Sequence, residues 1–559
     1  MALTPQSQAT RLTEKVRRHR GLTALLVITA VVCCILLYWA VWPDRAPGWT
    51  GIGPQTVEAG VIPAKTLWDW VELLLLPSVV LLVSAWWMRS RRLAEAKAAS
   101  LAAAQRAYES YIGTVSTLIM ERGLADSQSD DEIKTIARAL TATALREASP
   151  QQKGQIVGFL YDSGLLQVND PVVALRSLDL SQAKLAGIPL AGASFQGAHL
   201  NGAQLTGCDL SAADLRSASL ASADLSNAVI SGAYLRGANL EMAHLEGTDL
   251  AGATLSKADL AGANLAGANL SGANLNDANL QGANLDGADL RSAKLRGANL
   301  QGATLEYADL SLANLNHADL SDARLAHAKL DGANLSRVNA PNAKLQRASF
   351  SGAVMNDAVL PGADLRMTDL SMANMRGARL NAASLQDGFL RDAILGRADL
   401  SGADLKRAQL NRANLSLANL RSADLSKSIL EEAGLSGADL RNATLNGANC
   451  SGSVLRGAIM GGADLRNANL SMANLRWGNL INAKLRGADL TGADLSEAEV
   501  TREQLLSAKS VENAVMPDAP SPRRRTPSIT PDDQETFAEP PSPMPRRAGV
   551  QEQEEGHSI

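Results

Sequence analysis

The stretch ADLAGANLAGANLSGANLNDANLQGANLDGADL, residues 258–290, places a leucine at every fifth position. On an α-helix five residues advance about 500°, so successive leucines would lie roughly 140° apart and spread around the helix. On an unbroken strand an odd period would put consecutive leucines on opposite faces. A short extended piece followed by a corner satisfies the pattern: Ala263 and Leu265 face one way, Asn264 faces the other, and residues 266–267 turn the chain. Each unit therefore predicts one side of a coil.

Stacked coils of this kind predict a solenoid, in which strand backbones pair with the coils above and below at roughly 4.8 Å. Each side then contributes one large residue, Leu, and one small residue, Ala, to the interior. The units also resemble those of the pentapeptide-repeat proteins, which read A(D/N)Lxx. That resemblance implies four sides per coil, about twenty residues in a coil and a right-handed quadrilateral β-helix. The expected fold class is therefore an all-β solenoid.

The repeat keeps its register over a long part of the chain. From Leu180 to Val500 every position divisible by five holds an apolar residue, with Ala340 the weakest, which gives 65 centres. At four centres per coil this predicts about sixteen coils and a rod of roughly 75–80 Å. At Val338 and Ala340 the large and small inward residues are exchanged, which we interpret as local repacking rather than a functional kink.

Two apolar segments precede the array. Residues 21–42 carry no charge and are long enough for a transmembrane helix; residues 67–88 have charges only near their start and tryptophans at both ends. A cleaved signal peptide is the alternative for the first segment. Basic residues before the first segment and after the second predict that both ends of the chain are cytoplasmic. We therefore expect an integral, multi-pass protein of the bacterial inner (plasma) membrane.

The remaining segments complete the expected organisation. Residues 89–175 read as helices that connect the spans to the array and cover its first coil, since an open β-helix end exposes unpaired strand edges. This block resembles the connector of bacterial membrane-anchored pentapeptide-repeat proteins. The full assignment is a basic cytoplasmic N-terminus (1–20), transmembrane helix 1 (21–42), an extracytoplasmic loop (43–66), transmembrane helix 2 (67–88), the connector and N-terminal cap (89–175), the β-helix (176–505), a C-terminal cap (506–519) and a disordered tail (520–559).

The tail is rich in Pro, Ser, Glu and Arg and nearly free of bulky apolar residues, so it cannot bury a core. A basic cluster lies beside Thr526, Ser528 and Thr530. Phosphorylation, contact with anionic lipid and a simply solvated tail remain open alternatives.

No catalytic or metal-binding motif stands out. Cys208 and Cys450 occupy inward positions about twelve coils apart, far beyond disulfide reach. The four histidines of the array fall on outward positions in different columns and at different levels, so they predict no metal cluster. No phosphate loop, zinc spacing or pair of nucleophile and base is recognisable. We expect no enzyme activity, no cofactor and no metal.

Charge is the one functional indication in the array. Residues 176–290 hold 5 basic and 11 acidic side chains, whereas residues 291–490 hold 24 and 18. Counting at twenty-residue intervals predicts a basic stripe on one face that could bind an acidic partner. Its members are Arg347, Arg366, Lys406, Arg407, Lys427, Arg466 and Arg486. Neutral residues at 386, 426 and 446 interrupt the stripe, and ordinary solvation is the alternative.

Three functions compete. The first is a non-enzymatic, membrane-anchored scaffold that presents a rigid rod to unidentified protein partners. The second follows from the family resemblance, since some members imitate duplex DNA and bind type II topoisomerases. That mimicry needs a strongly acidic rod, yet residues 176–505 carry 30 basic and 33 acidic side chains, so we do not expect a nucleic-acid-related role. The third is an oligomeric transport or sensing component, for which Glu72 and Pro77 in the second apolar segment are the only support. Homo-oligomerisation is left open.

Overall fold

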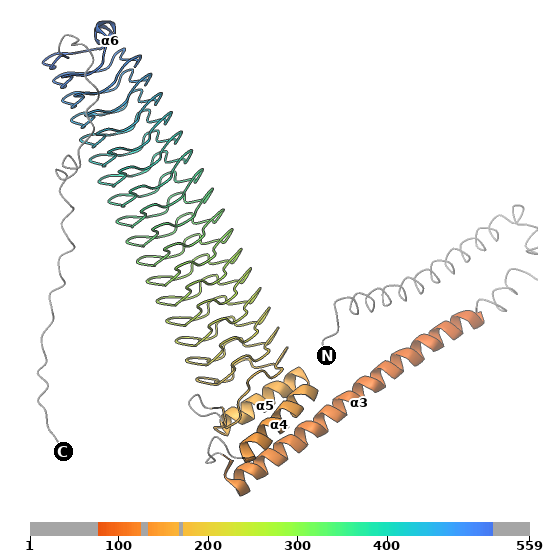
Figure 1. Cartoon of the computed structure of the whole chain (residues 1–559). Helices are drawn as coiled ribbons and strands as arrows, with labels where there is room; N and C mark the ends of the chain where they lie inside the picture. Colours follow the sequence, from red (N-terminus) through yellow and green to blue (C-terminus); the bar gives the residue numbers. More distant parts are fainter. Residues whose placement is uncertain (1–75, 125–131, 167–171, 518–559) are drawn as a thin grey trace, which may run out of the picture. The chain divides into compact units, whose positions relative to one another are not determined.

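The computed structural model describes residues 76–124, 132–166 and 172–517 (Figure 1). The chain divides into two compact units. The first comprises Met1–Gly113 with Glu147–Ser149, and the second comprises Thr114–Arg146 with Pro150–Ile559.

The described part of the first unit is mainly one long helix, α3 (Leu76–Arg122), whose last residues belong to the second unit. We expected a membrane span ending at residue 88 and a separate connector helix beyond it. The structure has one continuous helix instead, because residues 89–97 contain neither Gly nor Pro and consist largely of good helix formers.

The prediction of a multi-pass membrane protein with a cytoplasmic array is wrong by the structural criterion. Among the residues that the structure describes, no helix has both the length and the apolar character needed to cross a bilayer. In α3 the apolar part runs from Leu76 to Met88, about 20 Å of helix, before Arg89, Arg91 and Arg92 follow. A hydrocarbon core is about 30 Å thick. Residues 21–42 and 67–75, on which the rest of that prediction depended, lie outside the described residues.

The second unit begins with helices that lead into the coils. α4 (Glu132–Glu147) is followed by α5 (Pro150–Asp162), and α5 lies against the first coil (Figure 1). The backbone N–H of Lys184 donates to the Pro150 carbonyl at 2.9 Å, and the Lys153 ammonium donates to the Ser181 carbonyl at 3.3 Å. The Lys153 ammonium also lies 3.3 Å from a carboxylate oxygen of Asp179. These contacts occupy backbone groups that an open end would leave unpaired.

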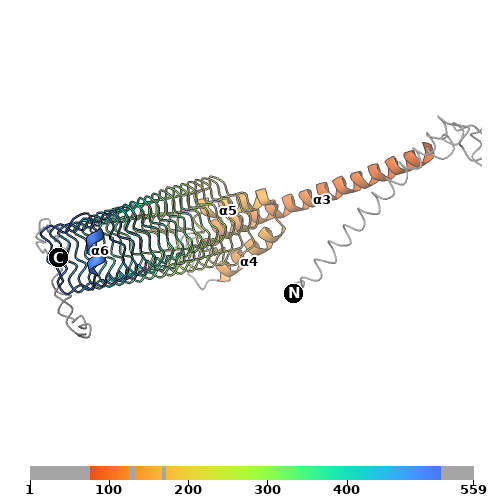
Figure 2. The same cartoon turned by 90° about the horizontal axis from the view of Figure 1, so that it is seen from above.

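The array is a stack of coils held by parallel bridges (Figures 1 and 2). Each bridge joins a residue to the one twenty positions later, from Asp179 with His199 to Asn479 with Glu499. Two sets of backbone hydrogen bonds accompany each side; Leu265 N–H, for example, donates to the Asn284 carbonyl at 2.7 Å. The twenty-residue coil with four short sides thus follows from the bridges themselves.

The interior is filled by the two inward residues of each side. Leu265 and Ala263 are fully buried, and so are nearly all their equivalents. Val338 and Ala340, the exchanged pair, remain buried, and the bridges continue past them through Asn339 and Val359. Burial also raises the pKa of the Cys450 thiol to about 12, so this cysteine is a core residue rather than a nucleophile.

The corners use left-handed backbone at the second residue after each inward Leu. Glycine is suited to this conformation, as at Gly267 with φ +63°, but many other residue types adopt it, including Ala382 (+57°) and Trp477 (+59°). The far end of the array departs from the predicted boundary at residue 505. Helix α6 (Arg502–Ser507), capped by Thr501, interrupts the sides, and the ladder then resumes with one extra residue, joining Asp494 to Val515.

Candidate interaction surface

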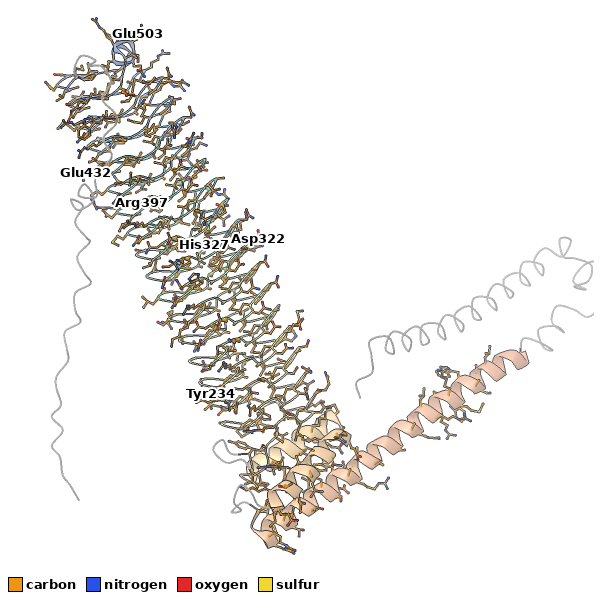
Figure 3. The ribbon with its side chains drawn as sticks, in the orientation of Figure 1. Tyr234, Asp322, His327, Arg397, Glu432 and Glu503 are labelled. Atoms are coloured by element: carbon orange, nitrogen blue, oxygen red, sulfur yellow. The ribbon has the colours of Figure 1, made fainter. Side chains whose placement is uncertain are left out.

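The outward side chains of the array are the ones available for chemistry, since the inward ones are buried. Figure 3 shows Tyr234, Arg397 and Glu432 on the outside of the coils. The residue before each inward Leu is mostly Asp or Asn, and its side-chain oxygen commonly accepts the N–H two residues later. Asp369, for example, accepts the Ser371 N–H at 2.9 Å. Asn269 in addition donates across to Asp249, one coil away, at 2.8 Å. These repeated polar groups therefore fasten the corners and the coils.

The seven residues of the predicted basic stripe share one corner of the coils. Because each bridge advances by twenty residues, Arg347, Arg407 and Lys427 fall in one column. The other four, Arg366, Lys406, Arg466 and Arg486, fall in the column one position earlier. The corner belongs to the turn between two faces of the array, one of which carries Phe389 in its outward row.

Four members of the stripe are neutralised by nearby carboxylates. Their closest nitrogen–oxygen distances are 2.7 Å for Arg366–Asp364, 3.1 Å for Lys406–Asp424, 2.6 Å for Arg407–Asp387 and 2.6 Å for Arg466–Asp464. Hydrogen bonding from Arg466 holds the pKa of Asp464 below its usual value, and Arg407 does the same to the pKa of Asp387. Carboxylates in ion pairs of this kind stay ionised and are poorly suited to accept a proton near neutral pH.

A local rule explains several of these pairs. Wherever the sequence reads Asp-Leu-Arg within the array, the arginine Nε and Nη2 donate hydrogen bonds to the carboxylate of the aspartate two residues earlier. The five instances are Asp214–Arg216, Asp289–Arg291, Asp364–Arg366, Asp439–Arg441 and Asp464–Arg466. A cation in such a tripeptide adds little to the charge that a partner would meet.

The other three members of the stripe are different. Within the described residues, Arg347, Lys427 and Arg486 have no carboxylate at ion-pairing distance. They lie about four and three coils apart, roughly 19 and 14 Å at 4.8 Å per coil. This spacing exceeds the Debye length of about 8–10 Å. The three charges therefore act as separate contact points rather than as one continuous field.

A second corner also carries cations that counting by charge alone did not single out. Arg236, Lys257, Arg296, Arg376 and Arg397 share this corner, and none has an ion pair within the described part of the chain. Near its far end the Trp477 ring lies between two guanidinium groups of the same corner, at 4.2 Å from Arg456 and 4.6 Å from Arg476. Cations without an ion pair among the described residues are thus found on both of these corners.

A shallow hollow of about 490 Å³ lies beside the first corner. It contains two exposed apolar side chains, Phe389 (41% exposed) and Met367 (45%). The full set of lining residues is Arg347, Ala348, Ser349, Met367, Asp369, Ser371, Phe389, Arg391 and Gln409. Apart from Arg347, no residue of this hollow belongs to the predicted stripe. The signal of the hollow was an aromatic residue at 389, in the position that most repeats fill with Asp or Asn.

Metal chemistry finds no support in the described ranges, where no three His, Cys, Asp or Glu side chains are grouped to hold an ion. Two of the outward histidines lie on corners, and the His327 ring stacks on Tyr307 with centroids 4.8 Å apart.

Comparison with solved structures finds other proteins with this repeat. HetL, a pentapeptide repeat protein involved in heterocyst differentiation regulation from Nostoc sp. strain PCC 7120, is 36% identical over 41% of this chain and 90% of its own, with a TM-score of 0.16. A form of QnrB1, a plasmid-mediated fluoroquinolone resistance protein, is 21% identical over 41% and 89%, with a TM-score of 0.16. A thylakoid-lumen protein of Arabidopsis thaliana is 35% identical over 17% and 62%, with a TM-score of 0.12. No curated protein matches the chain.

Because these TM-scores are well below 0.5, the assignment rests on the repeats themselves. The family model described as pentapeptide repeats (8 copies) matches more than half of the chain, in overlapping segments at 175–211, 213–252, 228–265, 243–282, 253–291, 283–322, 293–330, 318–357, 358–397, 398–433, 433–471 and 468–502. With the four-sided, twenty-residue coil seen in the bridges, this establishes the right-handed quadrilateral β-helix. The chain belongs to the pentapeptide-repeat family.

Proposed function

We propose that this protein is a non-enzymatic scaffold whose array, about sixteen coils long, binds the acidic surface of a protein partner. The observation that carries the proposal is the presence, on one corner of a rigid frame, of three cations that have no carboxylate partner among the described residues: Arg347, Lys427 and Arg486. On this corner four neighbouring cations are neutralised, so the three spare charges mark discrete points of attachment.

Two features of the structure support a binding role. The inward residues fill the coils and are nearly all fully buried, so recognition would use outward side chains. The frame is also pre-organised, because each side is bonded to the coils on both sides of it. A partner would meet side chains whose backbone does not need to be ordered on binding, which reduces the entropic cost of association.

The carboxylates of the array support a non-enzymatic role. A general acid or base that works near neutral pH usually has a pKa moved toward 7. Here the shifts run the other way: arginine contacts lower the pKa of Asp214, Asp289 and Asp439, as they do for Asp464. These aspartates are structural ion-pair partners.

Residues 89–175 are proposed as the helical connector and N-terminal cap, and the contacts of α5 with Lys184 and Ser181 support the capping role. The tail, 520–559, is proposed as a flexible arm on compositional grounds.

Charge reversal in the full-length protein would test the scaffold. Arg347→Glu, Lys427→Glu and Arg486→Glu together should abolish salt-sensitive binding of a protein partner captured from the native host and then purified. The matched control reverses Arg236, Lys257 and Arg296 on the other corner, which changes net charge equally, and should retain binding. Equal binding by both triple variants, or loss of binding on nuclease treatment alone, would reject the proposal.

A further inference from the structure

The hollow beside Phe389 differs from the neighbouring coil at the outward position of this face. In the neighbouring coil, Asp369 accepts the N–H of Ser371 at 2.9 Å. Phe389 is bridged directly to Asp369 and occupies the equivalent position, but its ring offers no acceptor for the N–H of Arg391. The coil therefore forgoes a corner hydrogen bond and exposes 41% of a phenylalanine to solvent. Neither change helps the array to fold.

The same substitution releases a guanidinium group. Residues 389–391 read Phe-Leu-Arg where five other sites read Asp-Leu-Arg, so Arg391 lacks the carboxylate that its equivalents grip. Its Nε lies 3.6 Å from a carboxylate oxygen of Asp392. That carboxylate already accepts hydrogen bonds from Nε and Nη2 of Arg412, at 2.8 and 2.7 Å. Arg391 thus keeps most of its bonding capacity.

A second spare guanidinium lies on the opposite rim. Arg347 lines the hollow from the other corner and has no ion-pair partner within the described residues. Asp369 in the floor already accepts the Ser371 N–H, and Met367 adds an apolar wall. The hollow therefore fits a segment with one large apolar side chain and carboxylates on both sides of it.

This chain contains such a segment beyond the described residues. Residues 532–539 read DDQETFAE, in which Phe537 is the only aromatic residue after position 517 and four acidic residues surround it. The described chain ends at residue 517, and its last bridged residue, Val515, continues the column of Asp494. That column borders the corner of Arg391.

The connecting length is sufficient. Val515 and Phe389 are separated by about six coils, roughly 30 Å along the array at 4.8 Å per coil. The twenty residues between positions 517 and 537 can span up to about 65–70 Å when extended. A tether of this kind holds its segment at an effective concentration on the order of millimolar, so individually weak contacts are enough for docking.

We propose that residues 532–539 dock in this hollow, with Phe537 against Phe389 and Met367 and its flanking carboxylates toward Arg347 and Arg391. The tail then acts as an internal ligand that covers one end of the basic corner and leaves Lys427 and Arg486 open. The docked tail and the proposed partner would compete for Arg347, but the docking rests on the hollow around Phe389 and does not require the scaffold function.

Site-specific photocross-linking in the full chain tests the docking. A benzoylphenylalanine at position 537 should cross-link within one chain to peptides between residues 347 and 409. Phe389→Asn should lower the yield about tenfold, and Arg347→Glu with Arg391→Glu should do the same. The Phe389→Asn array should fold normally, since Asn269, Asn449 and Asn469 occupy the same outward column, and far-UV circular dichroism would verify this.

Two control variants sharpen the result. Ile459→Asn makes a similar change at another exposed apolar position on a different face and should leave the yield unchanged. Lys427→Glu with Arg486→Glu, which weakens the proposed partner surface, should also leave it unchanged, so the two proposals fail separately. Cross-links that fall elsewhere, that ignore Phe389→Asn, or that join only chains of different isotopic label would overturn the docking.

Discussion

Replacing alanine by glycine at two corner positions should change stability in opposite directions. Ala382 is exposed and has φ +57°, so losing its methyl group relieves the steric cost of the left-handed region without losing buried contacts. Ala266 lies one position earlier in its own corner, where the backbone is not left-handed. The chemical change is identical at both sites; the local backbone differs, and Ala266 is half-buried whereas Ala382 is exposed.

The expected magnitudes follow from that difference. A left-handed conformation costs a non-glycine residue about 1–2 kcal/mol. Glycine in turn destabilises by about 0.5–1 kcal/mol, because the unfolded chain gains freedom. Ala382→Gly should therefore raise the free energy of unfolding by about 0–1.5 kcal/mol, and Ala266→Gly should lower it by about 0.5–1 kcal/mol. The unfolded-state contribution is common to both, so their difference of about 1–2 kcal/mol isolates the corner.

Urea denaturation of the full chain, followed by far-UV circular dichroism, would give the two midpoints. Repeat arrays can unfold in parts, so hydrogen exchange should accompany it. The Ala382 N–H, which donates to the Ser401 carbonyl at 2.9 Å, is a local reporter because Gly retains that donor. If both variants lost stability by the same amount, the corner backbone would not be a source of strain and the reasoning would be refuted.

Three further results are expected. On α5, Gly154→Ala should displace the cap, because a Cβ there would lie 1.9 Å from the Lys184 carbonyl oxygen. Gly158→Ala is the control and should leave the cap in place, because its Cβ would make only ordinary contacts. Faster hydrogen exchange of the Lys184 N–H in the first variant alone would distinguish them. Leu285→Ala, at a fully buried site, should lower the free energy of unfolding by about 2–5 kcal/mol in urea titrations. Arg466 lowers the pKa of Asp464, so this pair stabilises the fold at pH values above the unfolded pKa near 3.9. Its contribution disappears as pH falls through the lower pKa of the folded state. Arg466→Gln should therefore weaken the decrease in the free energy of unfolding at acid pH.

The repeat made the fold of the array predictable, because a period of five satisfies neither a helix nor a strand. Once the coil length is known, every outward residue has a fixed column, so the shared corner of Arg347 and Lys427 could be read by counting. The end of the array was harder to place. The repeat pattern ends at Thr501, but the ladder of bridges resumes at Ser510. Backbone hydrogen bonds need no particular side chain, so the sequence does not mark where they resume.

The interactions at the surface could be predicted only in part. Counting charges predicted a basic stripe but could not show that Arg407 reaches back one coil to Asp387. The prediction for the N-terminal region is wrong for a different reason. Residues 67–88 have the few charges and the terminal tryptophans typical of a membrane span, whereas the described helix continues through Arg89, Arg91 and Arg92 without a break. The hollow was missed because exposed Phe389 breaks a positional rule, and a composition count does not register position.

Position within the repeat, rather than the number of charges, decides how basic this array is to a partner. The excess of basic residues in 291–490 includes arginines of Asp-Leu-Arg tripeptides, and each of these arginines forms an ion pair with the aspartate of its own tripeptide. Where the residue before Leu is not acidic, the following arginine has no aspartate two residues earlier to pair with: Arg476 pairs with Glu497 instead, and Arg391, after Phe389, has only a 3.6 Å contact with Asp392. One substitution at position 389 thus exposes an apolar ring and frees a cation, which are the two components that a recognition site needs. In a frame this regular, function is most economically sought at the residues that break the local pairing rule.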